Sequence, residues 1–419
     1  MKKVAIIGTG ISGMSSAYFL HKDYDVHVFE KNDYIGGHTN TVTVLEAEKE
    51  IPIDTGFMVF NEVTYPNLIK LFQELNVPYH NTDMSFGVQH KPSGLEYTGT
   101  GLNGLFAQRK NILNPSYWKM LSQINRFSQT APIHLQSDTY KNKSIKEYVE
   151  ENGYGGDFYR KFLVPMSSAV WSTPPQKMDC FPALALIRFF YNHGFLGLNT
   201  QHQWKTVTGG SKTYRDILIK DFQDKIKTDS KIVQVIVGKD KISLRDINKN
   251  EYEFDFVIFA THADEILEIL ENPTPKQKNL LSKFAYQENI ALLHSDSSVM
   301  PKEKRAWSSW NYIITDDKTR ETYTVYYMNK LQNVSDKQNY FININGTEYV
   351  DPSKILKKIV YHHPVFSIEA MQAQEELFSL NTEETPLFFC GSYFRYGFHE
   401  DALLSSINLC NHILNREVL

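Results

Sequence analysis

Apolar residues open the chain in a pattern typical of a buried strand followed by a helix. Val4 to Ile7 is an uninterrupted apolar run rich in β-branched residues, which predicts a parallel strand buried on both faces. Ala17 and Leu20 then follow at helical spacing. Asp25 to Glu30 alternates between polar and apolar positions and predicts a second strand that ends in an acid. The chain therefore begins as a strand–helix–strand unit of an α/β fold.

Three glycines join the first strand to the helix in the pattern Gly8-x-Gly10-x-x-Gly13. Gly8 permits a tight turn, Gly10 a close approach of the backbone to a diphosphate, and Gly13 close packing of the helix on the strand. The N–H groups at the helix start, where Ile11 and Ser12 lie, favour the negative charge of such a diphosphate.

Glu30 lies about twenty residues beyond the glycines, where a carboxylate would bind ribose hydroxyls. The strand before the glycines, the helix after them and this acid together predict a dinucleotide site. Gly99 to Gly104 has the same glycine spacing, but it follows a polar segment and precedes no strand that ends in an acid. We therefore interpret this second match as a loop.

Beyond the first unit, apolar spacing predicts a helix-rich middle and a strand-rich later part of the chain. We expect a hairpin over 41–53, a helix over 64–75, a helix from 114 through 127, and two helices within 144–171 that are separated by Gly153-Tyr-Gly-Gly. We expect strands over 84–89, 95–98, 232–237, 256–261, 289–294, 306–315, 322–328 and 340–343. The last four strands are dense in tryptophan and tyrosine and would form the floor of a substrate site. The aromatic segment Phe181 to Leu198 suits either the wall of a hydrophobic pocket or a plain core helix.

Composition limits the class of protein. A length of 419 residues is enough for two domains, and a net charge of −4 gives no reason to expect nucleic acid as a partner. Three scattered cysteines fit a reducing compartment without a disulfide framework. The first predicted strand begins at residue 3, which leaves no room for a signal peptide, and no apolar run reaches the ~18 residues of a membrane span. We therefore expect a cytoplasmic protein.

Basic residues accompany the helix that begins near Asn114, namely Arg109, Lys110, Lys119 and Arg126. A basic amphipathic helix can dock on a membrane, which would make the protein peripheral on the inner face. The same pattern is also that of an ordinary helix with a solvated charged face. His362 and His363 have no third ligand nearby in the sequence, so we expect no metal site.

Two stretches after Glu30 carry a family resemblance. Gly36-Gly37-His38-Thr39-Asn40-Thr41 resembles the Gly-Gly-Arg-x-x-Thr motif of the FAD-binding flavoproteins of the amine oxidase superfamily, with His38 in place of the arginine. In that family the motif touches the FAD phosphates. Ile53 to Phe60 is similar to the segment in which a glycine, here Gly56, lets the backbone pass close to the isoalloxazine ring.

The later part of the chain continues this resemblance. Val233 matches the strand position that presents backbone groups to the adenine, and Ala260-Thr261 matches the strand end that closes over the pyrophosphate side. Gly391 to Ala402 resembles the last FAD motif, whose following helix points its N-terminus at the flavin ring. Asp401 stands where the family usually has glycine, and an acid there suits a helix cap better than a contact with reduced flavin.

The resemblance implies an α/β fold of two domains. A Rossmann-like, glutathione-reductase-like FAD-binding domain would comprise residues 1–80, 205–270 and 383–419, with an inserted α+β substrate domain of 81–204 and 271–382 that contains a mixed or antiparallel sheet. The glycine motif and the resemblance together predict as FAD-binding residues Gly8, Gly10, Ile11, Ser12, Gly13, Glu30, Lys31, Gly36, Gly37, His38, Thr39, Gly56, Phe57, Met58, Val233, Ala260, Thr261, Gly391, Ser392, Phe398, His399 and Ala402.

The reaction is inferred from a closer resemblance within the superfamily. Typical amine oxidases carry a lysine on a substrate-domain strand, whereas the matching segment Phe284 to His294 has none. The segments 53–61, 306–312 and 396–401 look closer to bacterial flavoproteins associated with cyclopropane and methyl-branched lipid modification. This implies an FAD-dependent dehydrogenase or desaturase that takes hydride from a fatty-acid or phospholipid chain to flavin N5. A flavin amine oxidase, a redox-neutral fatty-acid double-bond isomerase and a catalytically silent FAD-binding protein are the alternatives.

His399 and Glu400 are the candidate catalytic residues. They lie at the turn that should meet the flavin, and a histidine that titrates near neutral pH can accept a substrate proton. The alternative is that both residues only cap the helix and contact the flavin.

Overall fold

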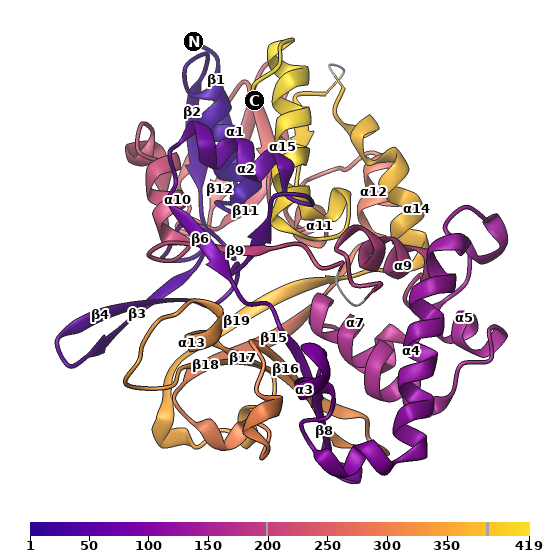
Figure 1. The fold of residues 1–419 in the computed structure, drawn as a ribbon. Helices are drawn as coiled ribbons and strands as arrows, with labels where there is room; N and C mark the ends of the chain where they lie inside the picture. Colours follow the sequence, from indigo (N-terminus) through magenta and orange to yellow (C-terminus); the bar gives the residue numbers. More distant parts are fainter. Residues whose placement is uncertain (198–199, 383–384) are drawn as a thin grey trace.

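The computed structural model describes residues 1–197, 200–382 and 385–419. A five-stranded parallel sheet occupies one end of the molecule (Figure 1). Its strand order is β10 (Ile226–Lys227), β2 (Asp25–Phe29), β1 (Lys3–Ile7), β14 (Phe256–Phe259) and β20 (Leu387–Phe389). The sheet therefore joins both ends of the chain to its middle. The predicted division into two domains stays a prediction, and its boundary at residue 383 lies outside the described residues.

The central strand β1 is buried on both faces because its apolar residues alternate between two cores. Val4 and Ile6 pack in the cluster that contains α1 (Ile11–Leu20), α2 (Pro66–Glu74) and α15 (His399–Leu414). Ala5 and Ile7 pack in the opposite cluster, with β11 (Ile232–Val237), β12 (Ile242–Asp246) and β13 (Glu251–Phe254). A period of two places successive side chains on opposite faces of a strand, so a continuous apolar run fills both layers.

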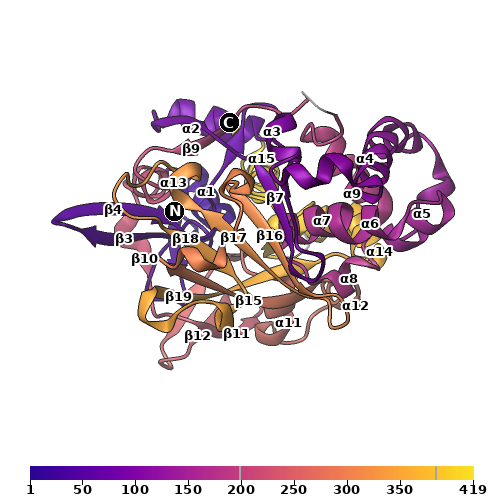
Figure 2. The ribbon, with the colours of Figure 1, turned by 60° about the horizontal axis from the view of Figure 1, so that its bottom comes forward.

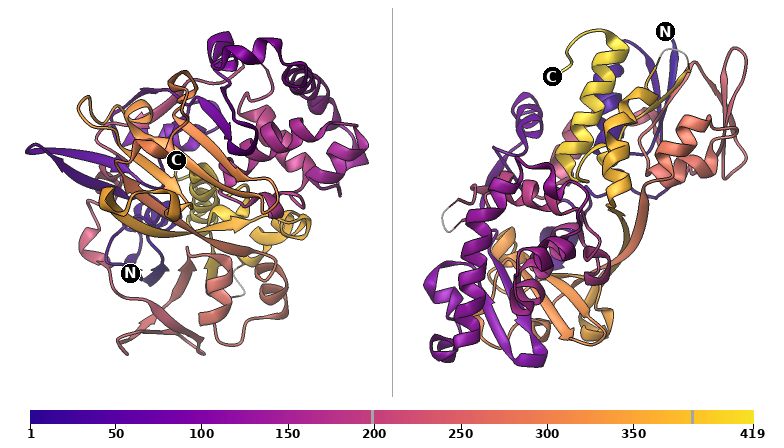
Figure 3. Two further views of the ribbon diagram at one scale, coloured as in Figure 1. Left: turned by 90° about the horizontal axis from the view of Figure 1, so that it is seen from below. Right: turned by 90° about the vertical axis from the view of Figure 1, so that its right-hand side faces the viewer.

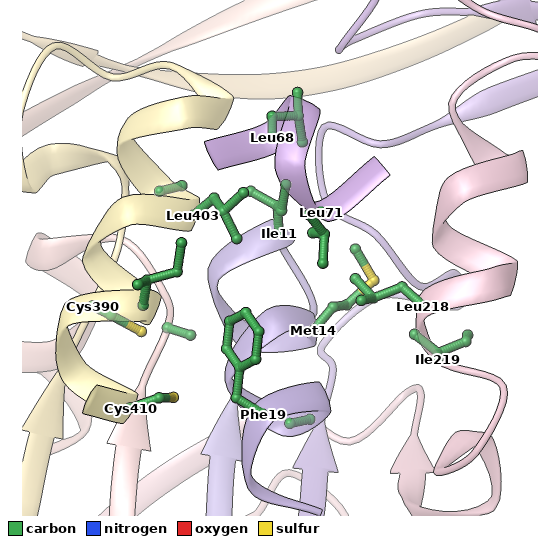
Figure 4. Packing of buried hydrophobic residues seen from close by; sticks show 14 of the residues in the cluster. Ile11, Met14, Phe19, Leu68, Leu71, Leu218, Ile219, Cys390, Leu403 and Cys410 are labelled. Carbon is green, nitrogen blue, oxygen red and sulfur yellow. The ribbon is translucent and has the colours of Figure 1, made fainter. Parts of the chain in front are cut away.

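Helices α1 and α15 lie side by side over one face of this sheet (Figures 1 and 4). Figure 4 shows Ile11 of α1 between Leu403 of α15 and Leu68 of α2, all of them buried. The hydroxyls of Ser16 and Ser406 form a 2.8 Å hydrogen bond between the two helices. Packing and this hydrogen bond therefore fix the position of α1 against α15.

A seven-stranded mixed sheet forms the other end of the molecule (Figure 2). Its order is β19 (Ile355–Val365), β15 (Ala285–His294), β18 (Phe341–Ile344), β17 (Glu321–Tyr327), β16 (Trp310–Asp316), β7 (Phe86–His90) and β8 (Leu95–Thr98), antiparallel except for the β16–β7 pair. β19 is an unpredicted strand, because its lysines, paired histidines and Pro364 lack an apolar alternation. Such a strand is tolerated at an edge, where one side needs no ladder partner.

Helices gather beside the mixed sheet, away from α1 and α15 (Figure 3). The longest is α4 (Pro115–His134), which begins where predicted because the side chain of Asn114 accepts hydrogen bonds from the N–H groups of Ser116 and Tyr117. The others are α3 (Gly101–Leu105), α5 (Ile145–Glu151), α6 (Gly156–Phe158), α7 (Val164–Trp171), α8 (Pro175–Met178) and α9 (Ala183–Asn192). α3 lies within the second glycine match, so the prediction of a loop there was wrong.

Shorter elements connect the two sheets. The predicted hairpin is confirmed as β3 (Thr41–Glu46) and β4 (Lys49–Asp54), and a small sheet contains β5 (Phe60–Asn61), β9 (Trp204–Val207) and β6 (Tyr79–Thr82). The remaining helices are α10 (Lys212–Leu218), α11 (Ala263–Ile269), α12 (Pro275–Leu281), α13 (Met328–Leu331) and α14 (Ile368–Leu377). Within the described ranges, no helix has the length and apolar character needed to cross a membrane.

Candidate cofactor and substrate cavity

A cavity of about 590 Å³ lies where the two sheets meet. One part of it, here called the dinucleotide end, is lined by Gly8, Thr9, Gly10, Ile11, Ser12, Glu30, Lys31, Asn32, Ser230, Lys231, Ile232, Thr261, His262, Glu265 and Glu268. A second part, the aromatic end, is lined by Tyr65, Met84, Val170, Trp171, Phe189, Phe195, Trp204, Trp310, Tyr326 and Phe398. The chain thus combines a polar nucleotide-like site and an apolar site in one cavity.

The three glycines at the dinucleotide end have different surroundings. Gly8 has a φ of +104°, and a Cβ there would lie 2.7 Å from the carbonyl oxygen of Ala260. A Cβ on Gly13 would lie 1.9 Å from the carbonyl oxygen of Gly8, so the helix packs on the turn too closely for any side chain. A Cβ on Gly10 would have no described atom within 4 Å, and Gly10 lines the cavity. Gly10 therefore leaves room for a ligand, as a diphosphate site requires.

The first turn of α1 faces this space without protein ligands for its amides. In the described part of the chain it has no side-chain cap and no acidic residue. Free N–H groups and the positive end of the helix dipole favour an anion here.

Glu30 is buried at the same end and its carboxylate is fixed by the chain. Its two oxygens accept hydrogen bonds from the backbone and hydroxyl of Thr9 and from the backbone and side chain of Asn32. These four donors match the capacity of a carboxylate, so a ribose hydroxyl has to displace one of them. The side-chain amide of Asn32, 2.8 Å from the carboxylate, can rotate away without moving the backbone.

His38 lines the cavity and replaces the family's arginine with a neutral ring. Its ring stacks on Tyr361 at 4.7 Å, and its Nε2 is buried with no hydrogen-bond partner among the described residues. Burial and, to a lesser degree, the nearby His362 lower the pKa of His38 to about 4. A buried, unpartnered ring nitrogen in a residue that lines this cavity fits a ligand that completes its hydrogen bonding.

His399 lies against Phe57, with ring centroids 3.8 Å apart and planes 8° from parallel. Its Nε2 lies 2.9 Å from the hydroxyl of Tyr214 and 3.1 Å from that of Thr39. Burial lowers the pKa of His399 to about 3, which is far below the range of an efficient general base at neutral pH. The geometry favours the alternative that His399 contacts the cofactor, and its catalytic role stays a prediction.

Glu400 is not among the residues that line the cavity, and its catalytic role stays a prediction that the geometry does not favour. Its carboxylate accepts hydrogen bonds from the backbone N–H groups of Asn67 and Leu68 and from the side chain of Asn67. These contacts cap the first turn of α2, where the helix has free amides. The neighbouring Asp401 caps α15 through the N–H groups of Tyr396 and Phe398, as its position suggested.

Most of the predicted FAD-binding residues come together in this cavity. Those that line it are Gly8, Gly10, Ile11, Ser12, Glu30, Lys31, Gly37, His38, Gly56, Phe57, Met58, Ala260, Thr261, Gly391, Ser392, Phe398, His399 and Ala402. The lining does not include Gly13, Gly36 and Thr39. Val233 is also outside it and is 36% exposed, whereas Ser230, Lys231 and Ile232 face the cavity at that point.

Three histidines that the sequence analysis did not predict as site residues also line the cavity. His262, His362 and His363 line the cavity together with His38 and His399. His262 stacks on Tyr286 at 4.2 Å, and burial lowers its pKa to about 4. No cluster of three or more potential metal ligands occurs among the described residues. The rings come from β19 and from the turn after β14, and no sequence motif links them.

The aromatic end has apolar walls and few polar groups. Trp204 and Trp310 both line it, and the Nε1 atom of each is buried without a described hydrogen-bond partner. The charged side chains among the lining residues, namely Glu30, Lys31, Lys231, Glu265 and Glu268, all belong to the dinucleotide end. The segment 181–198 contributes Phe189 and Phe195 to the wall and packs its other described aromatic residues mainly in a core; Leu198 lies outside the described residues.

Comparisons with known proteins identify the family. The family model described as flavin containing amine oxidoreductase matches residues 11–300. The 1-hydroxycarotenoid 3,4-desaturase of Flavobacterium sp. (strain P99-3) is 36% identical over 98 residues, 23% of this chain and 18% of the relative. The flavin-containing amine oxidase of Oncorhynchus mykiss is 23% identical over 289 residues, 66% of this chain and 53% of the relative. The matches thus span about a fifth and about half of these relatives.

Solved structures agree on the fold. A putrescine oxidase double mutant redesigned in its cofactor binding has a TM-score of 0.70 at 15% identity, over 99% of both chains. A fatty acid isomerase of P. acnes that produces CLA has a TM-score of 0.69 at 13% identity, over 98% of both chains. The glycine turn, the free first turn of α1 and the unpartnered His38 fit a bound FAD. The chain therefore belongs to the family of flavin containing amine oxidoreductases.

Proposed function

We propose that the protein is a dehydrogenase or desaturase that acts on the acyl chain of a fatty acid or phospholipid. The observation that carries the proposal is the chemistry of the aromatic end. Its walls are apolar, its described lining holds no carboxylate, and the indole N–H groups of Trp204 and Trp310 have no described hydrogen-bond partner. An indole N–H can only donate, so it matches a carbonyl or carboxylate oxygen and not an ammonium group.

The relatives support an apolar substrate without deciding it. One relative is named for a hydroxycarotenoid and one solved structure for a fatty acid, whereas another relative is named as an amine oxidase and another solved structure as a putrescine oxidase. β15 carries no lysine, and the two lysines in the described lining lie at the dinucleotide end. Aromatic faces also attract cations, so a flavin amine oxidase is the main competing function.

Residues at the dinucleotide end would bind the cofactor, and residues at the aromatic end would bind the substrate. FAD, when bound, supplies a hydride acceptor at N5 of its ring. The first turn of α1 would hold its diphosphate, Glu30 a ribose, and His38 Nε2 one of its polar atoms, while the backbone at Gly56 would pass the ring. Trp204 and Trp310 would orient the acyl head group and the aromatic walls would exclude water.

The overall reaction removes a hydride and a proton from neighbouring acyl carbons and leaves a double bond. The electrons would leave through oxygen or a quinone as the final acceptor. The aromatic walls would fix the acyl chain in one register, which determines the bond that is oxidised.

The test is anaerobic mixing of the FAD-loaded protein with candidate substrates. A monounsaturated fatty acid, a methyl-branched fatty acid and a phospholipid carrying either chain should bleach the visible flavin absorbance, and putrescine and benzylamine should not. Mass analysis of the lipid should show the loss of two hydrogens. Rapid reduction by an amine would refute the proposal. Conversion of the lipid to a positional isomer without a change in mass would identify the isomerase instead.

A matched variant tests the role of the indole donor. Trp310→Phe keeps an aromatic wall but removes the N–H, which should weaken binding of an acyl substrate about 3- to 10-fold, the effect of one hydrogen bond. Flavin content should not change, because Trp310 belongs to the aromatic end. If Trp310→Phe binds the acyl substrate as tightly as the unmodified protein does, the indole N–H of Trp310 does not contribute to substrate recognition.

A further inference from the structure

A long basic stretch stands out in an acidic chain. Between Glu96 and Asp138 the chain has no aspartate or glutamate, although the protein carries a net charge of −4. The charged residues of that interval are Arg109, Lys110, Lys119 and Arg126. The stretch itself therefore carries a positive charge, which is opposite in sign to the net charge of the whole protein.

Large apolar side chains are exposed within the same stretch. The exposed fractions are 75% for Leu102, 47% for Ile112, 87% for Leu113 and 50% for Trp118. Single exposed apolar residues are ordinary, but these four belong to adjoining elements: α3, the short 3-10 turn Arg109–Leu113 and the first turn of α4.

Contacts between these elements hold them side by side. Trp118 donates its indole N–H to the carbonyl oxygen of Ile112 at 2.8 Å, and its ring lies 5.2 Å from that of Phe106. Arg109 donates to the carbonyl oxygen of Phe106 and to the side chain of Asn103, each at 2.7 Å. We call the residues Leu102, Lys110, Ile112, Leu113, Trp118 and Lys119 the α3–α4 surface.

We propose that the α3–α4 surface docks the protein on an anionic lipid bilayer. Leucine tips and an indole enter the boundary between head groups and acyl chains, while lysines beside them bind lipid phosphates. The absence of acids in the stretch complements a negative surface. None of its six residues lines the cavity, and α3 lies with β8 at the end of the molecule far from α1 and α15 (Figures 1 and 3).

This inference deepens the proposed function but is tested separately from it. Flavin reduction reports on the substrate in the cavity, whereas vesicle binding reports on the surface. A lipid substrate resides in a membrane, so a docked enzyme would meet it there. If flavin reduction by acyl lipids fails while vesicle binding holds, only the substrate is wrong.

The experiment is co-sedimentation of the full-length, FAD-loaded protein with vesicles. The protein should bind vesicles of phosphatidylcholine mixed with phosphatidylglycerol. It should bind less tightly to vesicles of phosphatidylcholine alone, and its binding to the anionic vesicles should weaken as the salt concentration is raised. Leu113→Glu should lower binding to the anionic vesicles at least ~10-fold, because it removes an apolar side chain that would be buried in the bilayer and adds a charge that the anionic lipids repel. Lys110→Gln with Lys119→Gln should lower it about 25-fold, at about fivefold for each lysine.

Matched controls separate the surface from general exposure and charge. Leu45→Glu changes a leucine that is 72% exposed on the β3–β4 hairpin and should bind like the unmodified protein. Lys357→Gln with Lys358→Gln removes two exposed lysines of β19 and should also have little effect. Failure of the unmodified protein to bind either vesicle, or equal binding by Leu113→Glu, would overturn the proposal. A protein that sediments as a dimer without lipid and as a monomer in Leu113→Glu would assign the surface to a second copy instead.

Discussion

Two glycines of the first turn should separate cofactor binding from folding. Gly10→Ala adds a methyl group where no described atom lies within 4 Å, at a backbone φ of −58° that any residue adopts. Alanine is a poorer cap than glycine but restricts the unfolded chain, so the free energy of unfolding of the flavin-free protein should change by less than ~1 kcal/mol. The same methyl group points into the space where the diphosphate would bind.

The expected loss of affinity follows from the contacts that the methyl group obstructs. Displacing the diphosphate from one N–H of the α1 turn removes a hydrogen bond to a charged group, worth ~1.5–3 kcal/mol. Gly10→Ala should therefore weaken FAD binding about 10- to 150-fold. Gly13→Ala differs because its methyl group would lie 1.9 Å from the carbonyl oxygen of Gly8. Overpacking of this kind costs ~1–3 kcal/mol of unfolding free energy with or without flavin.

The assay measures the two quantities on each variant. Denaturant unfolding of the flavin-free proteins gives the free energy of unfolding, and titration with FAD gives the dissociation constant. Gly10→Ala should be near normal in the first and impaired in the second, whereas Gly13→Ala should be impaired in the first. Full FAD affinity in Gly10→Ala would refute the assignment of this turn to the diphosphate. An equal loss of stability in both variants would refute the structural contrast between the two glycines.

Two further predictions concern buried ionisable groups. Glu400→Gln should lower the free energy of unfolding by ~1–3 kcal/mol, because a charge-assisted cap on α2 is lost, and should leave the rate of flavin reduction unchanged; a rate loss of ~10²-fold would support its catalytic role. Flavin-free protein should lose stability as pH falls from about 6.5 toward 4. Burial lowers the pKa of His38, His193 and His262 to about 4 and that of His399 to about 3, so in that window the unfolded chain binds protons that the folded protein does not. Each histidine adds up to ~1.4 kcal/mol per pH unit. Asp401, whose pKa burial raises to about 6, acts oppositely, as do Asp54, Asp264 and Glu400, whose pKa values burial also raises. If the denaturant midpoint of unfolding is no lower at about pH 5 than at about pH 7, these pKa shifts are contradicted.

Local signals in the sequence predicted local structure well. The apolar run of β1, the glycine turn and the Asn114 cap of α4 each depend on residues within one turn or strand, so the sequence carries their full signal. The last FAD motif also led to the correct cap at Asp401, because its partners Tyr396 and Phe398 lie within five residues.

Non-local contacts account for what could not be predicted. Glu400 looked catalytic beside His399, but its partners Asn67 and Leu68 lie more than 330 residues earlier in the chain. Tyr361 and His363 reach the cavity only because β19 pairs with β15, and β19 has no apolar alternation to reveal it. The aromatic end combines rings from distant segments, so composition could suggest an aromatic pocket without placing its walls.

The order of strands in the parallel sheet has a consequence for the synthesis of the protein. β1 pairs with β14, and β14 in turn pairs with β20, which begins only at Leu387. The ribosome releases β1 and its neighbour β2 long before β14 or β20 exists, and closing such long loops is slow. Until α15 emerges, the face of α1 that carries Ser16 lacks its partner Ser406. A nascent chain stalled before β20 would expose one open strand edge of β14 and the uncovered face of α1, which are the surfaces that chaperones bind and that aggregation uses.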